Sequence, residues 1–129
     1  MSPEPAPSPR AATGAHGEDL AADHLRAHGY VVLARNWRLA TGALRGELDL
    51  ICRAPDGALT IVEVKTRRAG GRFGGPVAAV TPAKQAKIRS LALAFLHQSG
   101  LAARTLRFDV VGIEVGPGEP RITHIEGAF

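Results

Sequence analysis

The sequence predicts an α/β fold in which helices flank a central mixed β-sheet. Three observations support this: a helical pattern opens the chain, three strand-like apolar runs follow it, and a second amphipathic helix precedes two further strand-like runs. With 129 residues, of which 45% are hydrophobic and 22% charged, the chain has the size and composition of one globular domain. We therefore expect a single domain over residues 14–129, with the order α-β-β-β-α-β-β.

The first half of the chain is expected to contain a tail, one helix and three strands. Residues 1–13, rich in proline and alanine, are expected to be disordered. Gly29 is typical of the left-handed residue that ends a helix, which favours a helix over residues 15–28. Strands are expected over residues 30–34, 46–52 and 59–65, the last two joined by a hairpin turn at residues 55–57.

The second half is expected to add one helix and two strands. Thr81 is typical of a helix N-cap and Pro82 of the first helical position, and Gly100 marks the end of a helix that finishes near residue 98. A glycine-rich loop over residues 69–75 precedes this helix. Strands are expected over residues 106–113 and 121–125.

Two of the expected strands carry charged residues within otherwise apolar runs. Side chains alternate between the two faces of a strand, so Glu47 and Asp49 should share one face of the second strand. Glu63 and Lys65 should likewise share one face of the third strand. Burying an ionised group without a partner costs several kcal/mol, which indicates a functional reason for these charges. The residues expected on the opposite, packed faces are Leu48, Leu50, Cys52, Val62 and Val64.

The acids of these strands are candidates for a metal site. Asp49 and Glu63 should lie close together and offer two oxygen ligands to Mg²⁺ or Mn²⁺. Lys65, on the same face, could orient a water molecule or stabilise a phosphate. A buried Asp/Glu–Lys ion pair is the alternative, although the excess of acids favours a cation. Glu18 falls on the buried stripe of the first helix and could reach these acids; the alternative is a glutamate favoured there by the helix dipole.

The basic residues are concentrated in one part of the chain. The formal net charge is +4, and residues 64–108 contain nine Lys or Arg and no Asp or Glu. Such a block indicates a surface that binds a polyanion such as nucleic acid; a solvated basic surface is the alternative. The candidate nucleic-acid-binding residues are Arg67, Arg68, Arg72, Phe73, Lys84, Lys87 and Arg107.

Other features narrow the classes of protein that fit. The single cysteine excludes a disulfide framework, and no segment approaches the ~20 apolar residues that span a bilayer. The N-terminus lacks the apolar region of a secretory signal. We therefore expect a cytoplasmic protein with no membrane partner.

Glu18, Asp49 and the triplet Glu63-Val64-Lys65 together resemble the PD-(D/E)XK nuclease signature. A longer ordered set of motifs resembles the small bacterial YraN-like family over residues 14–129. These motifs are Gly17-Glu18, Gly29-Tyr30, Asn36-Trp37-Arg38, Gly46-Glu47-Leu48-Asp49-Leu50-Ile51, Val62-Glu63-Val64-Lys65-Thr66-Arg67, Lys84, Arg107-Phe108-Asp109-Val110 and Ala128-Phe129.

The resemblance implies a restriction-endonuclease-like, three-layer sandwich, similar to archaeal Holliday-junction resolvases. It also implies metal ligation by Asp49, Glu63 and the Val64 backbone carbonyl, with Lys65 catalytic and Glu18 assisting. In the signature the first acid follows a proline, whereas Asp49 follows Glu47-Leu48 in this chain. Glu47 therefore competes with Asp49 for the role of the first acid.

The expected function is therefore metal-dependent hydrolysis of phosphodiester bonds in DNA, including branched or damaged structures. One alternative is a nucleic-acid-binding module that keeps the fold without cutting. Another is a structural partner in a DNA-processing or cell-division assembly. A homodimer is left open.

Overall fold

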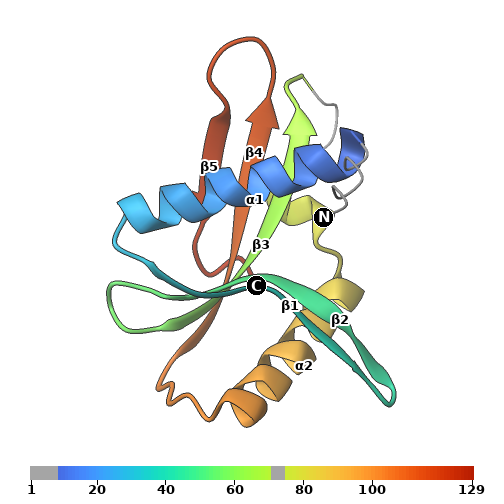
Figure 1. The fold of residues 1–129 in the computed structure, drawn as a ribbon, viewed down its shortest axis with the longest axis vertical. Helices are drawn as coiled ribbons and strands as arrows, with labels where there is room; N and C mark the ends of the chain where they lie inside the picture. Colours follow the sequence, from blue (N-terminus) through green and yellow to red (C-terminus); the bar gives the residue numbers. More distant parts are fainter. Residues whose placement is uncertain (1–8, 71–74) are drawn as a thin grey trace, which may run out of the picture.

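The computed structural model describes residues 9–70 and 75–129, with side chains described from residue 16 onward. Its helices and strands follow the order expected from the sequence, with one short 3-10 helix added (Figure 1). The elements are α1 (Pro9–Ala27), β1 (Val31–Thr41), β2 (Leu44–Arg53), β3 (Leu59–Arg68), η1 (Pro76–Ala79), α2 (Pro82–Ser99), β4 (Leu106–Val115) and β5 (Arg121–Ile125).

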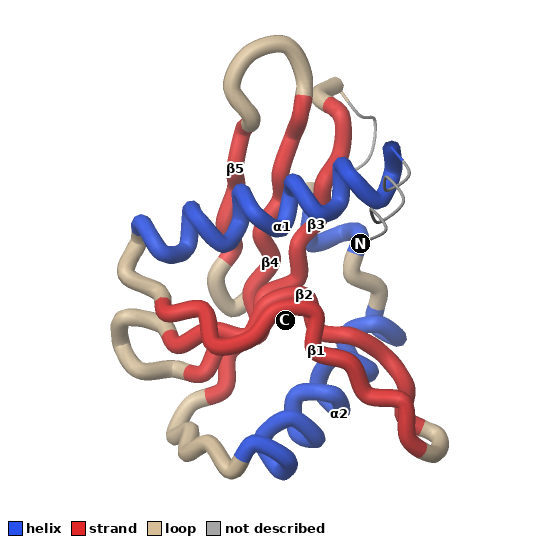
Figure 2. Tube along the Cα trace, viewed as in Figure 1, coloured by secondary structure: helices blue, strands red, loops and turns tan. Residues whose placement is uncertain are grey.

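The strands form one mixed sheet in the order β1-β2-β3-β4-β5. β3 and β4 are parallel, because the chain returns through α2 between them, and the other neighbours are antiparallel. α1 packs on one face of the sheet and α2 on the other, and Figure 2 shows the two helices on either side of the strands. The α/β fold with helices flanking a mixed sheet is thus confirmed. Within the described residues, no helix has the length and apolar content needed to cross a bilayer.

Several local predictions are confirmed. Thr81 caps α2 by accepting a hydrogen bond from the Lys84 N–H, Pro82 is its first residue, and Gly100 ends it with a left-handed φ of 69°. The β2–β3 turn is closed by Asp56, whose Oδ1 accepts from the Ala58 N–H at 3.0 Å.

Two boundaries differ most from the prediction, while β2, β3 and β4 are each two or three residues longer than expected. α1 begins at Pro9, so residues 9–13 are helical rather than part of a tail, whereas residues 1–8 lie outside the described part of the chain. Proline suits the first turn of a helix, and the alanines that follow it have high helix propensity. β1 continues to Thr41 and turns directly into β2, because Gly42 adopts the positive φ of 58° that this tight turn needs.

Each face of the sheet has its own hydrophobic core. The α1 core lies between α1 and the sheet, and the α2 core lies between α2 and the opposite face. The buried members of the α1 core are Ala21, Ala22, Leu25, Tyr30, Leu50, Cys52, Ala54, Ala58, Val62, Val111 and Ile113. Those of the α2 core are Leu39, Leu48, Ile51, Leu59, Ile61, Val80, Ile88, Leu91, Ala92, Phe95, Phe108 and Val110.

The expected common face for Leu48, Leu50 and Cys52 is wrong in one respect. Leu50 and Cys52 lie in the α1 core, but Leu48 lies in the α2 core together with Ile51. Residues 48 and 51 are three apart, so strict alternation is broken between them. The break falls between Leu48 and Leu50. Figures 1 and 2 show that the β1–β2 hairpin turns away from the rest of the sheet.

β2 also leaves β3 at this point. The antiparallel ladder between them ends at the pair Leu50↔Val62, whereas the parallel β3–β4 ladder continues to Arg68↔Val115. The part of β3 beyond Val62 therefore has a partner on only one side. This separation opens the cleft described next.

Candidate metal and nucleic-acid site

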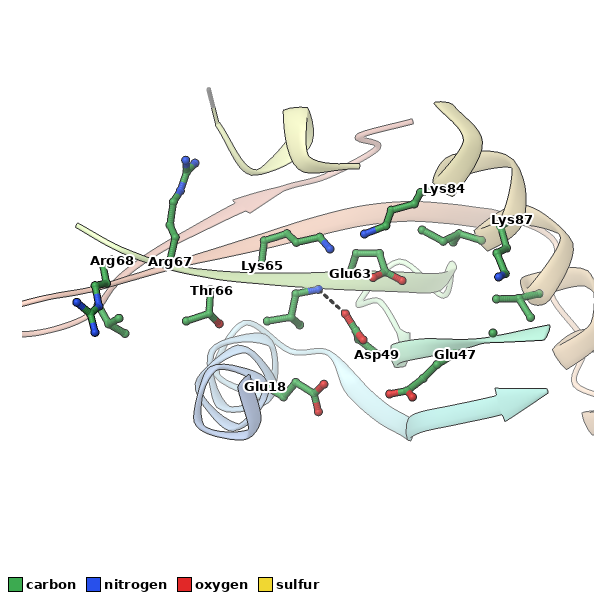
Figure 3. Close-up of a pocket in the computed structure, with 15 residues that line it drawn as sticks. Glu18, Glu47, Asp49, Glu63, Lys65, Thr66, Arg67, Arg68, Lys84 and Lys87 are labelled. Atoms are coloured by element: carbon green, nitrogen blue, oxygen red, sulfur yellow. Dashed lines mark hydrogen bonds between the residues drawn. The ribbon is translucent and has the colours of Figure 1, made fainter. Parts of the chain in front are cut away.

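A cleft of about 1040 Å³ lies where β2 separates from β3, and α1 and α2 supply further lining residues. Its acidic side chains are grouped in the middle and its basic side chains lie mainly toward the two ends (Figure 3). The lining residues are Glu18, Gly46, Glu47, Asp49, Glu63, Val64, Lys65, Thr66, Arg67, Arg68, Lys84, Lys87, Ile88, Leu91 and Val115.

Asp49 bridges the gap between the separated strands. Its Oδ2 accepts a hydrogen bond from the Val64 N–H at 2.9 Å, which gives that edge of β3 a partner where the ladder has ended (Figure 3). The bond uses one carboxylate oxygen and fixes the side chain beside Glu63. Asp49 and Glu63 therefore lie close together, as the sequence predicted.

Glu63 is the most buried acid of the cleft. The residue is 8% exposed, and its Oε1 has no hydrogen-bond partner among the described residues. Burial raises the pKa of this carboxyl well above its usual range, and the neighbouring charge of Asp49 raises it further. A buried carboxylate oxygen without a partner, facing a second carboxylate, fits a divalent cation.

A second group of acids includes Asp49. One carboxylate oxygen from each of Glu18, Glu47 and Asp49 lies within 4.8 Å of the other two, so these three residues could hold a metal ion. Burial raises the pKa of Glu18, and the charges of Asp49 and Glu47 act in the same direction. The sequence placed Glu47 on the same face as Asp49 and treated it as an alternative ligand, whereas the structure brings both carboxylates together with Glu18.

The approach of Glu18 to the other acids depends on two close packings. A Cβ on Gly17 would collide with the Thr66 hydroxyl of β3, so glycine allows α1 to lie directly on the strand. A Cβ on Gly46 would lie 2.8 Å from Leu91 of α2, so glycine there lets the hairpin pack closely on α2. The two glycines therefore let α1 and α2 pack closely on the strands that line the cleft.

Lys65 lies on the same side of β3 as Glu63 and is half-buried. Burial lowers the pKa of its ammonium group, and the positive charge of Lys84 lowers it further. In Figure 3 the amino groups of Lys65 and Lys84 both point toward Glu63. The sequence contains three lysines, and all three, including Lys87, line this cleft.

Of the other residues predicted to bind nucleic acid, some line the cleft and others do not. Arg67 and Arg68 line the cleft at the far end of β3, opposite to the end at α2 where Lys84 and Lys87 lie. Arg72 and Phe73 lie outside the described residues.

Arg107 is not brought to the cleft. Its Nε donates to Asp109 at 2.9 Å and its Nη2 to the Tyr30 hydroxyl at 2.6 Å, within a separate polar network on β4.

The fold and the cleft define an α/β protein with a candidate metal site flanked by basic residues. The chain belongs to the uncharacterised protein family UPF0102, whose model matches residues 17–113. It is 49% identical over 119 residues to a UPF0102 protein of Rhodococcus jostii, covering 92% of this chain and 96% of that one. It is 46% identical over 120 residues to one from Mycolicibacterium smegmatis, covering 92% and 93%. With a Geobacter sulfurreducens relative it shares 46% over 118 residues, covering 90% and 87%. The resemblance to the YraN-like family is thereby confirmed.

Proposed function

We propose that this protein is a nuclease that uses Mg²⁺ or Mn²⁺ to hydrolyse phosphodiester bonds within DNA strands, including branched or damaged DNA. The observation that carries the proposal is the unpartnered, buried Oε1 of Glu63 beside Asp49, with Lys65 on the same face of β3. The resemblance of these residues to the PD-(D/E)XK signature supports DNA as the substrate.

The residues that would hold the ion are Asp49, Glu63 and the backbone carbonyl of Val64, with Glu18 and Glu47 close enough to Asp49 to contribute. A divalent ion in such a site supplies Lewis-acid chemistry, which withdraws charge from a phosphodiester and makes water a better nucleophile at neutral pH. Oxygen ligands of this kind suit Mg²⁺ and Mn²⁺.

The chain's own cations have separate tasks in this proposal. Lys65 donates hydrogen bonds to a phosphate oxygen or to the attacking water, and stabilises the negative charge that develops during hydrolysis. Arg67 and Arg68 lie four and five residues beyond Glu63 on β3, about 13–17 Å along the strand. Lys84 and Lys87 lie toward the other end of the cleft. Phosphates on both sides of the cleaved bond would therefore be bound, which favours cutting within a strand.

Lys65 gives the sharpest test of catalysis against binding. Lys65→Ala should slow metal-dependent cleavage by about a hundredfold or more, with a smaller change in DNA affinity, because the lysine acts mainly on the transition state. Lys65→Arg keeps the charge but changes the donor geometry, so it should restore binding and not turnover. The measurements are single-turnover cleavage of linear and branched duplexes in Mg²⁺ or Mn²⁺, and DNA affinity in parallel.

Lys87→Ala is the matched comparison, because it removes another lysine of the same cleft away from the acids. It should weaken DNA binding and leave the rate of the bound complex nearly unchanged. Equal cleavage by the wild type, Lys65→Ala and Lys65→Arg would contradict the catalytic role of Lys65. DNA binding without metal-dependent cleavage by the wild type would instead favour a binding module.

A further inference from the structure

Asn36 has an unusual backbone conformation for its position in the middle of β1. Its φ is 52°, and it is the one non-glycine residue with a positive φ in the described part of the chain. Asparagine tolerates the left-handed region better than most residues, yet this conformation is still unfavourable inside a strand. Such strain persists only where the surrounding structure imposes it.

Asn36 lies at the bend of the β1–β2 hairpin, directly opposite Asp49. The next residue, Trp37, pairs with Leu48, which places Asn36 against Asp49 in the antiparallel register. Alternation breaks here in β1 as it does in β2: Ala34 and Trp37, three residues apart, both pack against the α2 core. The alternation of side chains between the two faces is therefore interrupted at the same level in both strands, where Asn36 has its left-handed backbone.

Its position opposite Asp49 puts Asn36 next to the acids of the cleft, because Glu18 and Asp49 belong to one group of carboxylates. Burial raises the pKa of Glu18, and hydrogen bonding by the Asn36 side chain acts in the opposite direction and favours the charged form. The preceding Arg35 lies 3.8 Å from the same carboxylate and 2.7 Å from Asp19. The residues at the bend of β1 therefore act on Glu18, the α1 acid that completes the group with Asp49 and Glu47.

We propose that Asn36 is a positioning residue for the metal-binding acids: its left-handed backbone bends the hairpin at Asp49, and its amide holds Glu18 beside Asp49 and Glu47. The assignment rests on the proposed function, because it concerns residues that would hold the ion. The competing explanation is that Asn36 only absorbs the twist of the hairpin and has no effect on Glu18.

The test is a Mn²⁺ titration of the full-length protein and its variants by calorimetry, with thermal unfolding measured for each. Asn36→Gly keeps the left-handed backbone and removes only the amide, so its melting temperature should stay close to the wild-type value. Its Mn²⁺ affinity should fall about tenfold, as is typical when a residue that orients a metal ligand is removed. In a Glu18→Ala background, Asn36→Gly should cause no further loss, since there is no carboxylate left to hold.

Asn36→Val tests the backbone part, because a β-branched residue resists positive φ. It should lower both the melting temperature and the Mn²⁺ affinity, and do so in the Glu18→Ala background as well. Wild-type affinity in Asn36→Gly, or an equal loss with and without Glu18, would overturn the assignment while leaving the proposed metal site intact. Absence of Mn²⁺ binding by the wild type would instead overturn the proposed function, and the assignment with it.

Discussion

A Glu63→Gln variant is expected to bind DNA at least as tightly as the wild type and to show no metal-dependent cleavage. Glutamine has nearly the same shape as glutamate, but it is neutral and a poor ligand for a hard cation. Glutamine also never carries the negative charge that glutamate gains on ionisation, so repulsion of the DNA phosphates should be equal or lower. Cleavage assays in Mg²⁺ or Mn²⁺ and DNA titrations without metal measure the two effects separately.

The same variant should remain folded. In the metal-free protein the pKa of Glu63 is raised by burial and by Asp49, so this group stabilises the fold most at low pH and that stabilisation is lost as pH rises through the folded-state pKa. Glutamine carries no such charge, so this pH-dependent loss should be absent from its unfolding curves. Glu119→Gln, the same change on an exposed turn, is the control for both assays. Unfolding of Glu63→Gln at neutral pH would show that the acid serves a buried ion pair.

The second large effect is expected on stability, at Asp109. This residue is fully buried and accepts hydrogen bonds from Arg107 through both of its oxygens, from His124 at 2.7 Å and from the Gly127 N–H at 3.0 Å. Asp109→Ala leaves the Arg107 guanidinium without its main partner. We expect a loss of about 3 kcal/mol in the free energy of unfolding, the low end for breaking a buried pair, since Arg107 is 20% exposed.

The pH dependence of this effect has a definite sign. Burial would raise the pKa of Asp109, but the hydrogen bonds from His124 and Arg107 outweigh burial and hold the pKa below its ordinary value of 3.8. A carboxyl group whose pKa is lowered by folding stabilises the fold at pH values above its unfolded-state pKa. This stabilisation is lost as the pH falls through the folded-state pKa. The free energies of unfolding of wild type and Asp109→Ala, measured in urea, should therefore converge as the pH is lowered into the acid range.

The control is Asp23→Ala, which removes an exposed acid paired with Arg26 and should change stability little. An equally small effect of Asp109→Ala would contradict the structural role of the network.

The parts of the fold that follow from local chemistry were predictable from the sequence. The caps of α2, the turn closed by Asp56 and the bounds of β5 depend on a few neighbouring residues, and the structure agrees with the prediction for each. The proximity of Asp49 to Glu63 also followed, because each is the residue next to the last pair of the β2–β3 ladder, Leu50↔Val62.

The remaining features depend on long-range packing. Strict alternation of side chains predicted that Leu48 and Leu50 lie on one face of β2. This rule takes no account of a left-handed residue on the neighbouring strand, which the structure has at Asn36. The meeting of Glu18 and Glu47 requires both that bend and the close approach of α1 at Gly17. An asparagine between Arg35 and Trp37, just beyond the expected first strand, was the available signal for the bend.

The role of Arg107 shows a second limit of sequence reasoning. Charge along the chain grouped this residue with the cleft cations, whereas the structure gives it partners in Asp109 and Tyr30. An acid two residues away on the same strand lies on the same face, so the Arg107–Asp109 spacing already contained the signal for an ion pair.

The most direct test of the account is calorimetric titration of the metal-free protein with Mn²⁺, comparing wild type with Asp49→Asn. Asparagine keeps an oxygen that can accept the Val64 N–H, so the variant should fold while losing a charged ligand shared by both acidic groups. The account predicts saturable binding to the wild type and its loss in Asp49→Asn, with matching melting temperatures. Equal Mn²⁺ binding by both proteins, or no binding to the wild type with or without DNA, would contradict a metal site in this cleft.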